Sequence, residues 1–138
     1  MQMIRVSTFL RTALLADAVT CAGMGLLMSL FSTGLGNLLS LPAMLLFYAG
    51  LSLFPVSTFL LYVATRRKTA APLVWAIMFG NALWTLDSVL ILLTGWVTPN
   101  ASGLYFVLFQ AAGVAVFICL EFIGLKKSQE ETAAAFQH

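Results

Sequence analysis

Charged residues are the scarcest component of this sequence. They make up 9% of the 138 residues, whereas 61% are hydrophobic, and the mean hydropathy is +0.99. A typical soluble domain has about 25% charged residues, so this chain has too few of them to cover a surface that faces water. The composition therefore excludes an ordinary soluble domain, and the length leaves room for one domain.

Histidine and cysteine are almost absent as well. The one histidine is His138, the last residue, so we expect neither haem ligation inside a bundle nor a histidine-based zinc site. Cys21 and Cys119 lie in separate apolar segments without a CxxC pair, which argues against a disulfide. The sequence contains no P-loop, GxGxxG, GxSxG or HExxH motif. We therefore expect no cofactor, no metal and no enzymatic activity.

Long apolar segments make up most of the chain. A bilayer core of about 30 Å is crossed by about 20 apolar residues in a helix, and four segments reach that length: 8–31, 42–65, 73–97 and 101–125. Residues 32–41 contain glycine and asparagine, which predicts a loop, and residues 128–138 are expected to be a polar, frayed cytoplasmic tail. The predicted fold is all-α, an antiparallel bundle of four transmembrane helices within residues 1–127.

The positive charges all fall at one end of such a bundle. They precede the first segment, follow the second and follow the fourth, at Arg5, Arg11, Arg66, Arg67, Lys68, Lys126 and Lys127. The positive-inside rule therefore predicts that both termini are cytoplasmic. We expect a multi-pass protein of a cell membrane, with the bacterial inner membrane as the favoured location. The net charge of +2 follows from this distribution, so nucleic acid is not an expected partner.

Six polar side chains interrupt the apolar segments and are the candidate site residues. Counting about 1.5 Å of helix per residue places them at three depths, which predicts three pairs: Arg11 with Glu121, Asp17 with Asn81, and Asp87 with Gln110. The pairs can be structural, because hydrogen bonds between helices hold a bundle in register. Alternatively, the two aspartates exchange protons or cations during transport, since acids inside a membrane often mark ion pathways.

The surroundings of the two aspartates resemble each other. Residues 16–19 read ADAV and residues 86–89 read LDSV. Each of these segments leads to a turn with proline, a second apolar segment and a basic run. Two tandem hairpins in the same orientation would produce this pattern, and chance similarity between apolar helices is the alternative.

Three short stretches carry a resemblance to known proteins: LADA at 15–18, NALW at 81–84 and TGW at 94–96. With the overall pattern of residues 8–125, they make the chain similar to the many small four-span integral membrane proteins of bacteria. The resemblance implies a bundle in the bilayer and no particular activity. The sequence lacks the arginine- and asparagine-bearing helix expected of glutathione-type membrane enzymes and the early glutamate flanked by aromatics expected of small multidrug exporters.

Two functions are compatible with these features. The first is a non-enzymatic accessory or assembly subunit that packs in the lipid bilayer against another membrane protein or a second copy of itself. The second is a small proton- or cation-coupled transporter or channel that uses the intramembrane aspartates.

Reporter fusions test the predicted topology. Because the basic clusters are expected to stay in the cytoplasm, a reporter joined after residue 36 or residue 100 should be external, and one joined after residue 70 should be internal. A cytoplasmic signal from either of the first two fusions would contradict the predicted arrangement.

Overall fold

The computed structural model describes residues 3–137 and is almost entirely helical. Four helices are long and apolar enough to cross a membrane: α1 (Thr8–Leu30), α3 (Ala43–Thr65), α4 (Ala71–Leu93) and α5 (Ala101–Gln137). The predicted all-α fold with four spanning helices is confirmed. Each predicted span begins or ends within a few residues of the observed helix, except at the far end of α5.

Two segments differ from the prediction. The loop predicted for residues 32–41 is wrong, because Ser32–Leu39 form a short helix, α2, that ends at Ser40 with a left-handed φ of 56°. Leu35 and Leu39 lie four residues apart and pack on the core, a helical spacing masked by Gly34, Gly36 and Asn37 around them. The frayed tail predicted from residue 128 is also wrong, since α5 continues to Gln137. His138 lies outside the described residues.

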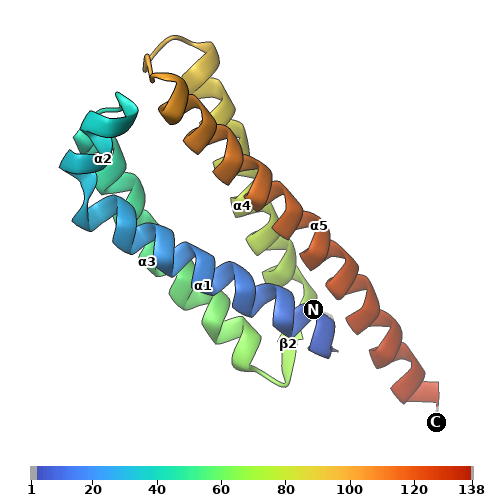
Figure 1. Cartoon of the computed structure of the whole chain (residues 1–138). Coiled ribbons are helices and arrows are strands. Elements are labelled where there is room, and N and C mark those ends of the chain that lie inside the picture. Colours follow the sequence, from blue (N-terminus) through green and yellow to red (C-terminus); the bar gives the residue numbers. More distant parts are fainter. Residues whose placement is uncertain (1–2, 138) are drawn as a thin grey trace.

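The long helices pair as two hairpins (Figure 1). α1 packs along α3, and α4 packs along α5, while α1 also crosses α5. α3 and α4 scarcely touch each other. The hairpin arrangement that the sequence allowed is therefore present, and the contact between α1 and α5 joins its two halves.

Small residues bring α1 and α3 close together. Gly25 of α1 faces Gly50 of α3, and a Cβ atom on Gly25 would lie 3.0 Å from the Gly50 carbonyl oxygen. Near the middle of the pair, the Ser57 hydroxyl donates a hydrogen bond of 2.8 Å to the Ala18 carbonyl. In lipid, close backbone approach and hydrogen bonds of this kind stabilise helix pairs.

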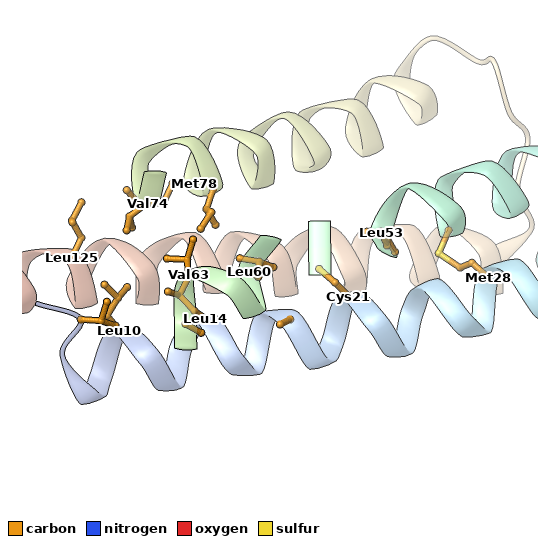
Figure 2. Packing of buried hydrophobic residues seen from close by; sticks show 14 of the residues in the cluster. Leu10, Leu14, Cys21, Met28, Leu53, Leu60, Val63, Val74, Met78 and Leu125 are labelled. Carbon is orange, nitrogen blue, oxygen red and sulfur yellow. The ribbon is translucent and has the colours of Figure 1, made fainter. Parts of the chain in front are cut away.

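The apolar core is densest where the two hairpins cross. Figure 2 shows Leu10 and Leu14 of α1 beside Val63 of α3, with Val74 of α4 and Leu125 of α5 at the same end of the cluster. All five side chains are at most 1% exposed. The hairpins are therefore packed tightly at one end.

That end, the basic end, is also held by polar bonds. The strand β1 (Met3–Arg5) pairs antiparallel with β2 (Lys68–Ala70), which lies in the connection between the hairpins. The hydroxyls of Ser7 and Ser128 are 3.0 Å apart. Beside them Gly124 is close enough to α1 that a Cβ atom would lie 2.7 Å from the Leu10 Cα. These contacts hold the part of α5 beyond the predicted span against α1 and β1.

The opposite end has its own link between the hairpins. Asn100 precedes α5, and its side-chain carbonyl accepts a hydrogen bond of 2.8 Å from the Gly103 N–H, which caps the helix. The amide of the same side chain donates to the Leu38 carbonyl of α2 at 2.8 Å. The hairpins are thus joined at both ends, and they diverge between these joints (Figure 1).

Candidate functional site

Three polar side chains from three helices meet inside the protein and form the acidic cluster: Asp17, Asn81 and Glu121. The Asn81 amide nitrogen on α4 donates to the Asp17 carboxyl on α1 and to the Glu121 carboxyl on α5, each at 2.9 Å. The exposed fractions are 1% for Asp17, 7% for Asn81 and 0% for Glu121. One amide therefore links both hairpins, close to the middle of α4.

The acidic cluster contains a buried acceptor atom that forms no hydrogen bond within the described part of the chain. The second carboxyl oxygen of Glu121, Oε2, is buried and has no hydrogen-bond partner among the described residues. The other Asp17 oxygen accepts a weak bond of 3.5 Å from the Cys21 thiol. Leaving a buried polar atom without a partner costs about 1–3 kcal/mol, so the cluster has room for one more donor, proton or cation.

The predicted pair of Asp17 with Asn81 is confirmed, but the pair of Arg11 with Glu121 is wrong. The Arg11 guanidinium donates to the carbonyls of Ala64, at 2.9 Å, and Arg66, at 3.1 Å, at the end of α3. A cation is favourable there, because the last carbonyls of a helix are unbonded and carry partial negative charge. A depth measured from residue 125, the end of the predicted span, places Glu121 too near the cytoplasmic end, because α5 continues to Gln137.

The predicted pair of Asp87 with Gln110 is wrong as well. Gln110 accepts a hydrogen bond from the Trp84 indole and donates one of 2.9 Å to the Ser88 hydroxyl. Asp87 is exposed. One residue turns a helix by about 100°, so a depth count cannot distinguish Asp87 from Ser88.

Trp84 and Ser88 are site residues that the depth count missed. Their spacing of three and seven residues from Asn81 places all three on one face of α4. That periodicity was available in the sequence and indicates the face that meets α5.

A cavity of about 610 Å³ lies between the hairpins beside the acidic cluster. All four long helices contribute to its wall. The wall includes Asp17, Asn81 and Gln110 and is otherwise mostly apolar, with the aromatic residues Phe59, Trp84, Phe106, Phe109 and Phe117. Glu121 is fully buried and lies outside this wall.

The cavity opens sideways, where the two hairpins diverge. α3 and α4 scarcely touch, and the lining residues Val56 and Phe59 of α3 are 42% and 38% exposed. Gly80 on the facing side of α4 also lines the cavity and is exposed. In a membrane, this opening faces the hydrocarbon region rather than either aqueous side.

Cys21 and Cys119 are both free. Among residues 3–137, no three side chains of the metal-binding types gather into a possible site.

The four apolar helices make the chain a multi-pass membrane protein. Within that class its distinguishing feature is the acidic cluster beside a laterally open cavity. Comparison of the chain with protein-family models, with curated proteins and with solved structures gives no match. Its function is therefore inferred from the cluster and the cavity.

A double-mutant cycle tests the acidic cluster. Asn81→Ala and Glu121→Ala should each lower thermal stability in mild detergent, and together they should cost less than the sum, because both remove the same bond. We expect a coupling of about 0.6–2 kcal/mol, typical of hydrogen bonds between membrane helices. The control cycle uses Asp87→Ala and Gln110→Ala, whose losses should simply add. Additive losses for Asn81 and Glu121 would show that the bond does not form.

Proposed function

We propose that this protein is a small transporter or channel that moves protons or small monovalent cations through the acidic cluster. The supporting observation is that two buried carboxyl groups share one amide nitrogen. Two like charges this close repel strongly where the dielectric constant is low. A bound proton or cation removes that repulsion, and this is the chemistry that a carrier needs.

A purely structural role explains the cluster less well. A structural network should satisfy each buried acceptor, yet Glu121 Oε2 has no partner among the described residues. The cluster also borders a cavity through Asp17 and Asn81, which gives an ion or water a way to reach it. Acids that face a cavity inside a membrane commonly mark ion pathways. In this proposal Glu121 takes the role that the sequence assigned to Asp87.

The hairpin arrangement suits a carrier. The hairpins are joined by a few polar bonds at each end, such as Ser7 with Ser128 and Asn100 with Leu38. Rocking of one hairpin against the other about these joints could expose the acidic cluster to either side, as repeat units do in other transporters. We propose that the basic end faces the cytoplasm, in a bacterial inner membrane. This function involves no enzymatic step and no resident cofactor.

Ion flux into proteoliposomes tests the transporter proposal. Under an imposed membrane potential, vesicles with the wild-type protein should take up protons or sodium faster than empty vesicles. Asp17→Asn and Glu121→Gln should each lower that flux on the order of tenfold or more, because an amide cannot bind a proton as a carboxylate does. Asp87→Asn is the matched control and should keep the wild-type rate.

Two results would overturn the proposal. The first is a wild-type protein that leaves vesicles as tight as empty ones to both ions. The second is equal flux through wild-type protein and a folded Asp17→Asn variant.

A second function, that of an accessory or assembly subunit, is favoured by Asp87. This carboxyl group is exposed on α4, about 9 Å before the helix end at Leu93. Its exposed neighbours Leu86 and Leu90 are apolar. A charge that faces lipid costs about 2.5–3.5 kcal/mol on insertion scales. A neighbouring helix with a donor or cation at the same height, from another membrane protein or a second copy, would relieve this cost.

Purification in mild detergent tests the accessory role. The wild-type protein should elute with a partner chain or as a dimer, and mass spectrometry identifies which. Asp87→Asn should release the partner, because the amide carries no charge, whereas Glu130→Gln, at an exposed acid beyond the span, should not. A wild-type protein that elutes alone as a monomer would exclude this second function.

A further inference from the structure

We propose that the cavity binds a lipophilic organic cation, which enters from the lipid and places its charge beside Asp17. This inference rests on the proposed function, because it assigns a substrate class to the same carboxyl groups. The cavity volume of about 610 Å³ lies within the range of about 300–1,000 Å³ that small-molecule sites occupy. The site therefore has room for an organic molecule and not only for a bare ion.

The sign of the ligand's charge follows from the cavity wall. Asp17 lines the cavity, and no lysine or arginine lies among its lining residues. The aromatic rings of Phe59, Trp84 and Phe106 face the same space, and aromatic faces attract organic cations. An anion would meet the acidic cluster without any compensating charge, so the wall selects for a cation.

The route of entry requires that the ligand dissolve in lipid. Hydrogen bonds join the hairpins at the basic end, through Ser7 and Ser128, and at the opposite end, through Asn100. The exposed lining residues Val56 and Gly80 lie between these ends, on the diverging helices α3 and α4. A molecule that reaches the cavity by this side must first partition into the hydrocarbon region.

Binding of the cation should release a proton. The groups that face Asp17 are Cys21 on its own helix, Asn81 on α4 and Glu121 on α5, and α3 contains no charged residue. A proton held between the two carboxyl groups neutralises one negative charge, and a bound cation can take over that task. The exchange balances: one cation enters, one proton leaves to water, and no covalent bond changes.

The probe for this site is tetraphenylphosphonium, and its control is tetraphenylborate, an anion of nearly the same shape. Equilibrium dialysis of the purified protein in detergent should show saturable binding of the phosphonium ion and no saturable binding of the borate. In weakly buffered solution, binding should release up to one proton per ion. Asp17→Asn should weaken phosphonium binding on the order of tenfold or more, the effect of losing one close opposite charge in a site of low dielectric.

Two variants distinguish phosphonium binding inside the cavity from binding elsewhere on the protein. Gly113 lines the cavity, and a Cβ atom there would meet nothing within 4 Å, so the side chain of Gly113→Leu should extend into the cavity. It should abolish phosphonium binding while Asp17 stays in place, with an unchanged melting temperature as proof of folding. Asp87→Asn removes an intramembrane acid that is not part of the cavity wall and should bind like the wild type.

Three results would overturn the cation site. They are equal binding of the two probe ions, undiminished phosphonium binding by Asp17→Asn, and undiminished binding by a folded Gly113→Leu variant. Each of these would mean that the cavity does not bind the cation beside Asp17. Phosphonium binding without ion flux in vesicles would support the cation site and overturn the transporter proposal. Ion flux without phosphonium binding would support the transporter proposal and overturn the cation site.

Discussion

The bond from Asn81 to two carboxyl groups is the interaction on which the arrangement of the hairpins depends. Among residues 3–137, side-chain hydrogen bonds join the two hairpins at three levels: the basic end, the opposite end and Asn81 between them. In lipid the hydrophobic effect does not drive helices together, so close packing and such bonds must do so. Asn81 supplies the bond at the level where α3 and α4 diverge and the cavity opens.

The interior combines close packing within each hairpin with a buried hydrogen-bond acceptor that has no partner among the described residues. Within each hairpin, small residues such as Gly25 and Gly50 allow close packing, and the basic end adds a compact apolar core around Leu10 and Leu125. Between the hairpins, one amide serves two acids, and one oxygen of Glu121 has no partner in the described part of the chain. The close packing thus lies within the hairpins and at the basic end, while the acidic cluster adds the Asn81 bond between the hairpins and retains capacity for a ligand.

The spans and one polar pair could be predicted from the sequence, and the physical basis of those predictions also explains why the other two pairs are wrong. Hydrophobic length identifies a membrane helix, and the depth count correctly paired Asp17 with Asn81. A depth estimate says nothing about rotation around the helix axis. It therefore pairs Gln110 with Asp87, whereas in the structure Gln110 bonds to the next residue, Ser88. The depth of Glu121 depended on where α5 ends. Residues 128–137 are polar but rich in glutamate, glutamine and alanine, which favour helix, so polarity alone did not indicate that the helix ends near residue 125.

The most direct test of this account is solid-state NMR of the carbon-13- and nitrogen-15-labelled protein in lipid bilayers. The Asn81 side-chain nitrogen should correlate through space with the carboxyl carbons of both Asp17 and Glu121, and the Glu121 signal should be lost in Glu121→Gln at an unchanged Asp17 signal. A Glu121 carboxyl that correlates instead with the Arg11 guanidinium would contradict the acidic cluster, and so would an Asn81 side chain that shows neither correlation.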